Sequence, residues 1–224
     1  TTIATADQVL QFWLVDVGEK GWYDGNATLD ATIRERFRPT WDRAAELAPA
    51  WAVTPRGALA ALILTDQFPR NMYRNDPRAF ATDPLARQIA NAAIAAGFDQ
   101  EIAPPARQFF YMPFEHSEHL ADQKRCIDLF RENMPGESLQ HAEMHHDTIA
   151  KFGRFPWRND ALGRPASAAE NRVMQAGGYG ALMAEALTRA EQSLFEQHCE
   201  WSVEACRKAE LSRDVLTLIS QIGR

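Results

Sequence analysis

The feature that most constrains the fold of this 224-residue chain is the spacing of its apolar side chains, together with the residues that interrupt that spacing. In nearly every segment an apolar residue recurs every three or four positions, which is the period of an amphipathic helix. Capping residues, prolines and glycines separate the segments, and no segment needs to be a strand. The sequence therefore predicts an all-α protein of antiparallel helix pairs joined by short turns, arranged as a bundle or a right-handed solenoid.

Boundary residues predict where several helices start and stop. Thr54-Pro55 has the order of a cap followed by a proline in the first turn, and Ser167 with Glu170 has the spacing of a capping box. Pro39 is expected to kink the second helix, and Ser117 is expected to cap a helix that begins at Glu118. The expected helices cover about residues 6–15, 30–48, from 55 onward, 83–96, 104–113, 118–133, 139–152 and from 168 onward.

We expect two parts, a helical domain over residues 1–180 and a helical extension over residues 181–224. The extension contains no proline and has an apolar stripe, so it is expected to pack on the same domain or on a partner chain, and a homodimer is an open alternative. No apolar run approaches the roughly 20 residues that cross a bilayer, and the three cysteines are odd in number. These features predict a cytoplasmic protein with no membrane partner.

Arginines gather in two segments of an otherwise acidic chain. The net charge is −6 and the pI about 5.5, which argues against nucleic acid as a partner. Yet TDQFPRNMYR (65–74) and GRFPWRN (153–159) each follow an apolar helix and place Phe-Pro, Arg and Asn in what we expect to be an exit loop. Because a guanidinium binds carboxylate or phosphate oxygens through two parallel donors, the two loops predict a site for an anion. The alternative is that these arginines only tie helix ends to internal acids, namely Asp66, Glu115, Glu118 and Asp160.

The stretch PFEHSEHLADQ (113–123) is the candidate for chemistry. His116 is the expected base, with Glu118 expected to orient it, as in a small-molecule hydrolase or another acid–base enzyme. A zinc site from His116, Glu118 and His145 is the less favoured alternative, and Glu143 with His146 supplies one copy only of a di-iron spacing that requires two. A third alternative is that the stretch only starts a helix. We predict no metal, and no motif for a nucleotide, a dinucleotide or a redox thiol pair appears, so no cofactor is predicted.

Four longer motifs together resemble a known family. VLQFWL, LAALILTDQFPRNMYRNDPRAFATDPLA, FFYMPFEHSEHLADQ and HHDTIAKFGRFPWRNDALGR resemble, in order and spacing, the uncharacterised bacterial domain of unknown function family 924 over about residues 8–175. The resemblance implies a tetratricopeptide-like helical fold and no established activity. Trp157 and His119 depart from the pattern of this family, which weakens a metal site at either position.

The expected function is binding of an anionic group, either a peptide carboxylate or a small acidic metabolite, at a polar site of arginine and histidine. Besides His116 and Glu118, the expected ligand-binding residues are Asp66, Gln67, Arg70, Asn71, Arg74, Gln123, His145, Arg154, Arg158, Asn159 and Arg164.

Overall fold

The computed structural model describes residues 2–186 and residue 188. The chain divides into two units, Thr1–Gly178 and Tyr179–Arg224. The described part of the second unit is helical, and the amphipathic helices expected further along the extension lie outside the described residues. The rest of this section concerns the first unit.

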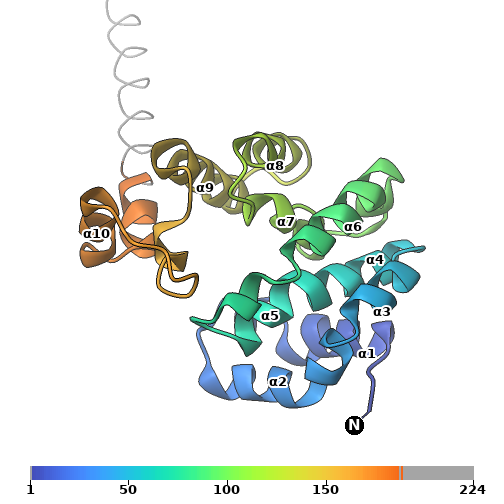
Figure 1. The fold of residues 1–224 in the computed structure, drawn as a ribbon. Coiled ribbons are helices and arrows are strands. Elements are labelled where there is room, and N and C mark those ends of the chain that lie inside the picture. Colours follow the sequence, from blue (N-terminus) through green and yellow to red (C-terminus); the bar gives the residue numbers. More distant parts are fainter. Residues whose placement is uncertain (1, 187, 189–224) are drawn as a thin grey trace, which may run out of the picture. The chain divides into compact units, whose positions relative to one another are not determined.

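The first unit is helical, and no strand occurs in the described part of the chain, which confirms the all-α prediction. Figure 1 labels the α-helices. They are α1 (Ala6–Leu10), α2 (Ala27–Trp41), α3 (Ala44–Trp51), α4 (Pro55–Leu62), α5 (Phe68–Met72), α6 (Asp83–Ala95), α7 (Met112–Glu115), α8 (Leu120–Asn133), α9 (Glu137–Phe152) and α10 (Ala168–Gln175). Two π-helices, η1 (Gln11–Val17) and η3 (Ile63–Gln67), continue α1 and α4. Short 3₁₀ segments are η2 (Glu19–Gly21), η4 (Pro77–Phe80), η5 (Phe98–Glu101), η6 (Ala106–Phe110) and η7 (Pro156–Arg158).

Several predicted boundaries are confirmed. The Thr54 hydroxyl accepts the N–H of Gly57 at 3.1 Å at the start of α4. Ser167 and Glu170 form the expected capping box at the start of α10. Gly153 follows α9 with φ of 70°, in the left-handed region that glycine enters without steric penalty, and this ends the helix.

One predicted helix is two. The segment expected to run over residues 30–48 divides into α2 and α3, and α2 begins earlier because the Asn26 side chain accepts the N–H groups of Thr28 and Leu29. Pro39 lies inside α2. The break follows it, where the N–H of Arg43 donates to the carbonyl of Thr40 and thereby closes a three-residue turn.

The stretch around Ser117 also differs from the prediction. Pro113 does not end a helix but lies in the first turn of α7, where a missing N–H has no helical partner to lose. Helix α8 begins at Leu120, after His119. The Ser117 hydroxyl accepts the N–H of His119 and donates to Asp122 at 2.6 Å. Ser117 therefore shapes the turn between α7 and α8 rather than capping a helix.

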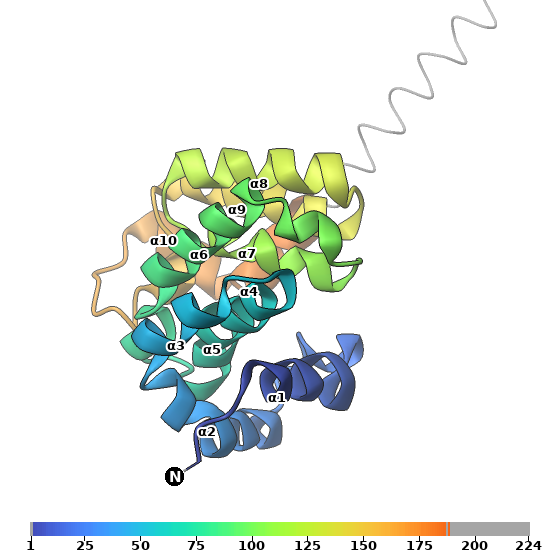
Figure 2. The same cartoon turned by 90° about the vertical axis from the view of Figure 1, so that its right-hand side faces the viewer.

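Helix α4 is the centre of the core. Every residue from Gly57 to Leu62 is buried, and the helix packs against α1, α3 and α6. An aromatic group of Phe12, Phe37 and Phe68 joins η1, α2 and α5, with ring centroids 4.7 to 6.1 Å apart. Helices α8 and α9 lie side by side in Figures 1 and 2. The tetratricopeptide-like arrangement stays a prediction.

No helix in the described part of the chain is long and apolar enough to cross a membrane.

Candidate functional site

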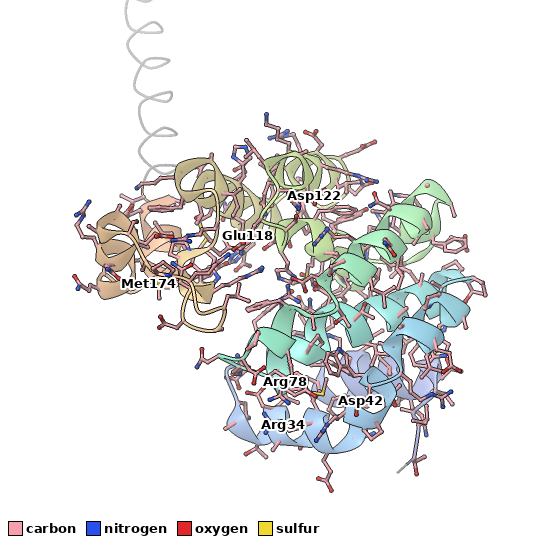
Figure 3. The ribbon with its side chains drawn as sticks, in the orientation of Figure 1. Arg34, Asp42, Arg78, Glu118, Asp122 and Met174 are labelled. Atoms are coloured by element: carbon pink, nitrogen blue, oxygen red, sulfur yellow. The ribbon has the colours of Figure 1, made fainter. Side chains whose placement is uncertain are left out.

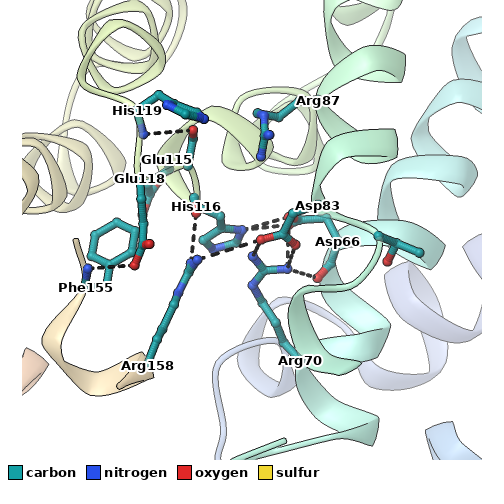
Figure 4. Close-up of polar contacts among 12 residues, drawn as sticks. Asp66, Arg70, Asp83, Arg87, Glu115, His116, Glu118, His119, Phe155 and Arg158 are labelled. Carbon is teal, nitrogen blue, oxygen red and sulfur yellow. Dashed lines mark hydrogen bonds and ion pairs between the residues drawn. The ribbon is translucent and has the colours of Figure 1, made fainter. Parts of the chain in front are cut away.

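A buried carboxylate and an imidazole form the centre of the candidate site. Asp66 is 1% exposed, and both of its carboxylate oxygens lie 2.9 Å from Nδ1 of His116. Gln67 donates to the same carboxylate at 2.5 Å. Nε2 of His116 makes no hydrogen bond with the described residues, and the side chain is 13% exposed. Asp66 therefore holds the imidazole at Nδ1, and the other ring nitrogen, Nε2, remains available for a ligand (Figure 4).

The position of Asp66 depends on an uncommon backbone form. It lies in η3, a π-helix inserted between α4 and α5 in a segment expected to be an exit loop. The extra residue per turn of a π-helix shifts the side chains that follow it, and such insertions occur frequently at functional sites. All five residues of η3 are buried, so the shift aims Asp66 into the molecule.

Two arginines and a second aspartate adjoin the pair. Arg70, one turn after Asp66, lies 3.1 Å from its carboxylate and donates two parallel bonds of 3.0 Å to Asp83 at the start of α6. Arg158 of η7 lies 3.8 Å from Asp83 and donates to the backbone carbonyl of His116 at 2.9 Å. Figure 4 shows Arg70 and Arg158 approaching Asp83 from different elements. The two charged segments recognised in the sequence therefore meet at α6.

These charges set the protonation of the pair. Burial raises the pKa of Asp66, but Arg70 and His116 outweigh it and lower that pKa to about 2. Burial and the nearby Arg70 lower the pKa of His116 below its ordinary value, against the opposing influence of Asp66. At neutral pH Asp66 is thus a carboxylate and His116 a neutral imidazole that donates Nδ1–H to it. The lone pair of His116 then lies on Nε2.

Among the arginines of the predicted site, Arg158 has the least complete pairing within the described residues. Its guanidinium lies between the rings of Phe80 and Phe155, at 4.5 and 4.6 Å from their centroids. Burial, followed by repulsion from Arg70, lowers its pKa to about 10, so it remains charged at neutral pH. Within the described residues, Nε and Nη1 make no hydrogen bond. Arg158 therefore holds donors that no internal acceptor takes.

A second carboxyl–imidazole pair lies beside the first. Glu115 is 6% exposed, and its carboxyl group lies 3.1 Å from Nδ1 of His145 on α9. Burial, and then the charge of Asp66, raises the pKa of Glu115 to about 8. Burial lowers the pKa of His145 to about 3. At neutral pH Glu115 is therefore a carboxylic acid and His145 a neutral ring.

Three further carboxylates hold the remaining predicted cations. Glu118 binds Arg164 through two bonds of 2.7 and 3.0 Å and accepts the N–H of Phe155, so it does not orient His116 as expected; Asp66 does. The other two carboxylates are Asp30, which binds Asn71 and Arg74, and Glu170, which binds Arg154 and Asn159.

The structure thus separates the predicted site residues into two sets. The central set is Asp66, Gln67, Arg70, His116, His145 and Arg158. The peripheral set is Asn71, Arg74, Glu118, Gln123, Arg154, Asn159 and Arg164. Gln123 is fully buried, and its amide donates at 2.6 Å to the carbonyls of both Glu115 and Ser117, which secures the α7 turn.

The described residues contain no group of three or more metal-ligand side chains that could hold an ion. The zinc alternative needed His116, Glu118 and His145 to converge, but these side chains pair with Asp66, Arg164 and Glu115 respectively.

Two central residues were absent from the predicted site, Asp83 and Glu115. Asp83 was read as a helix start, and it is one, but its carboxylate also joins the two arginines. Glu115 precedes His116 in the sequence stretch that was singled out. A signal existed, because a glutamate inside the apolar run FFYMPFE is expected to be buried.

Comparisons with known proteins agree with the fold. The profile of a family described as bacterial protein of unknown function (DUF924) matches residues 9–178. A solved structure of a protein of unknown function, ATU0120, from Agrobacterium tumefaciens is 39% identical, with a TM-score of 0.73, over 77% of this chain and 97% of that one. No curated protein matches the sequence. The match over the whole first unit, together with the structural likeness, shows that the chain belongs to the DUF924 family of bacterial proteins.

Proposed function

We propose that the protein is an acid–base enzyme acting on a small substrate that carries an anionic group. His116 takes a proton at Nε2, Asp66 orients the ring and Arg158 holds the anion. The observation that carries the proposal is an imidazole bound at Nδ1 by a buried carboxylate, with Nε2 unbonded in the described structure. A carboxylate behind a histidine fixes its tautomer and stabilises the imidazolium that forms when it takes a proton.

The protonation states favour this role. A base must be unprotonated before the reaction, and the lowered pKa of His116 provides that at neutral pH. Asp66 stays ionised under the same conditions, so it can stabilise the proton once it is taken. Activation of water for hydrolysis is one reaction class that uses such a base without a cofactor, and a small-molecule hydrolase is the form of the proposal we favour.

Arg158 supports the choice of an anionic substrate. Arg70, Arg154 and Arg164 each bind a carboxylate through two bonds, whereas Arg158 has one backbone bond and one ion pair of 3.8 Å. A carboxylate or phosphate oxygen is the acceptor that suits its unused donors. Either a small acidic metabolite or the carboxylate of a peptide has this chemistry, and a tetratricopeptide-like scaffold, if present, would suit the peptide.

Chemical modification tests the base directly. Diethyl pyrocarbonate acylates unprotonated, accessible imidazole nitrogens, so His116 is expected to react at pH 7 and His145 to react more slowly, as judged by peptide mass mapping. Asp66→Asn should change the rate at His116, because the group that fixes the tautomer is altered. A His116 that stays unmodified in the folded wild type would overturn the proposal.

Sulfate tests the anion site, since it stays a dianion across the useful pH range. Sulfate is expected to raise the unfolding temperature and to protect His116 from the reagent, because a ligand at 100 times its dissociation constant stabilises by about 2.7 kcal/mol. Arg158→Met should abolish both effects. Arg154→Met is the matched control and should keep both, because Glu170 already holds Arg154. Equal loss in the two variants would argue against Arg158 as the specific donor.

A purely structural role of the charged network is the second candidate. Its support is that Arg70, Arg74, Arg154 and Arg164 all bind internal carboxylates. On this alternative Arg158→Met would lower stability, and sulfate would have no effect on the wild type. A cytoplasmic location, the absence of a nucleic-acid partner and a homodimer stay predictions.

A further inference from the structure

The carboxyl group of Glu115 lies between two helices, and no lysine or arginine of the described residues forms an ion pair with it. Glu115 is the last residue of α7, and its carboxyl group lies 3.1 Å from Nδ1 of the neutral His145 on α9. His145 Nδ1 also lies 2.8 Å from the carbonyl of His141, which can only accept, so that nitrogen carries a hydrogen. The Nδ1–H group of His145 is therefore shared between the His141 carbonyl and the Glu115 carboxyl group, and the neutral ring brings no positive charge to Glu115.

The other elements packed on α7 place few compensating charges near this carboxyl group. Asp66 of η3 acts on it with a like charge, and Arg70 of α5 opposes that effect but already binds both Asp66 and Asp83. Cys126 of α8 is buried, and its pKa is raised well above the ordinary value, so it is a neutral thiol.

Two further arginines on neighbouring elements have partners elsewhere. Arg87 of α6 lies 3.6 Å from Asp122, and Arg107 of η6 donates to the carbonyl of Ile102 at 2.9 Å.

The net charge of the central set together with Asp83 and Glu115 therefore depends on the proton of Glu115. With Glu115 neutral, Arg70 and Arg158 balance Asp66 and Asp83, so an arriving anion meets no net negative charge there. Loss of the Glu115 proton would add a negative charge beside Asp66 in a buried region. Repulsion between like charges is strong there because little water screens it.

We propose that Glu115 is a specificity-determining residue that links anion uptake to a proton: the site accepts an anionic ligand only while the Glu115 carboxyl group is protonated. The inference rests on the proposed function, since it requires an anion to bind beside His116. Glu115 acts on the ligand through charge, so it is a positioning residue rather than a catalytic one.

Sulfate affinity measured against pH tests the inference. In the wild type the dissociation constant is expected to be constant from pH 7 to about 8 and then to rise, by up to tenfold for each further pH unit, as one linked proton is lost. Glu115→Gln keeps a neutral side chain of the same shape and should abolish this alkaline rise. Glu137→Gln is the matched control on α9 and should keep the wild-type profile, because its side chain is 88% exposed.

A second measurement uses the wild type alone. Calorimetry of sulfate binding at pH 8.5, in two buffers with different ionisation enthalpies, should report uptake of a fraction of a proton for each sulfate bound. At pH 6.5 the uptake should vanish, because Glu115 is already protonated there. This measurement keeps the inference testable even if Glu115→Gln fails to fold.

The outcomes distinguish the two proposals. Absence of sulfate binding at every pH overturns the proposed function and the inference with it. Sulfate binding without proton uptake, or with an alkaline rise that Glu115→Gln retains, overturns the inference and leaves the proposed function in place.

Discussion

At the scale of single residues, the two adjacent carboxyl–imidazole pairs have their carboxyl groups in different protonation states. The Asp66 carboxylate is ionised beside His116 because Arg70 lies 3.1 Å from it. Glu115 is protonated beside His145 because burial and the Asp66 charge oppose its ionisation. Environments that separate the pKa values of two acids in this way are typical of sites that move protons.

The raised pKa of Glu115 predicts a pH dependence of stability. The pKa of Glu115 is about 8 in the folded state, above the ordinary value of 4.5, so the folded state holds an extra proton between those two values. The stabilisation is fully present below about pH 4.5 and is lost as pH rises through 8. His145 acts in the opposite sense, but only below its ordinary pKa of 6.5. From pH 6.5 to 8 the Glu115 effect should therefore dominate, with a loss of up to about 2 kcal/mol.

Urea unfolding at pH 6.5, 7.5 and 8.5 measures this loss. Glu115→Gln should show a nearly flat free energy of unfolding over the same range. If both proteins lose stability equally, a group other than Glu115 causes the decrease in the free energy of unfolding as the pH rises.

Arg70 predicts a second effect at the residue scale. Arg70→Met would leave Asp66 and Asp83 without their shared cation, and removal of one partner from a buried ion pair typically costs about 3–5 kcal/mol. Arg78→Met is the control, since that exposed arginine pairs with Asp76 and lies well apart from Glu118 in Figure 3. Urea unfolding should show a large loss for the first variant and little change for the second. Similar losses would mean that the buried network contributes no more than a surface pair.

At the scale of elements, the segment after α9 is bound to the turn between α7 and α8. Glu118 accepts the N–H of Phe155 and binds Arg164, so it fixes both ends of the segment that carries Arg158. Figure 3 labels Glu118 near the segment that leads to α10. The position of Arg158, which donates hydrogen bonds to the anion in the proposed function, thus depends on Glu118, which does not contact that anion.

Glu118→Gln should loosen this segment without unfolding the unit. The amide can still accept the Phe155 N–H but loses the charge that binds Arg164, and a half-buried pair of this kind contributes about 1–2 kcal/mol. Hydrogen exchange at Phe155 should become faster, while exchange in the middle of α4 stays slow. Glu143→Gln is the control, because its pair with Arg131 is exposed. Unchanged exchange at Phe155 would show that packing alone holds the segment.

The elements also show how far the sequence predicts this fold. Local signals, such as Thr54 before Pro55 and Ser167 before Glu170, gave correct helix starts because the capping bonds join residues three apart. The π-helix η3 was not predicted, because its backbone shift depends on tertiary burial and leaves an ordinary helical pattern in the sequence.

Two partners of the arginines, Asp30 and Glu170, were missed for a related reason. Arg74 binds Asp30 from 44 positions away, and Arg154 binds Glu170 from 16 positions away. Counting acids near each arginine in the sequence therefore made the two segments look more positive than they are. His116 was found because it stands out locally, but its partner Asp66 lies 50 residues earlier, and the sequence favoured the nearer Glu118.

At the scale of the whole molecule, the first unit has its own core. The buried hydrophobic cluster runs from Val9 on α1 to Ala142 on α9, and the family match ends at residue 178. The central residues of the proposed site all precede that point. We therefore expect the second unit to be dispensable for the fold and for sulfate binding.

A chain ending at Gly178 tests this expectation and the predicted homodimer together. The shortened chain should unfold cooperatively, with a free energy of unfolding close to that of the full chain, and should keep the sulfate effect, because core and site lie within the first unit. If residues 181–224 join two copies through their apolar stripe, sedimentation should give twice the 25.2 kDa mass for the full chain and a monomer for the shortened one. A full chain that sediments as a monomer at every concentration would exclude the homodimer. A shortened chain that fails to fold would show that the extension stabilises the first unit directly, which is the other arrangement expected for it.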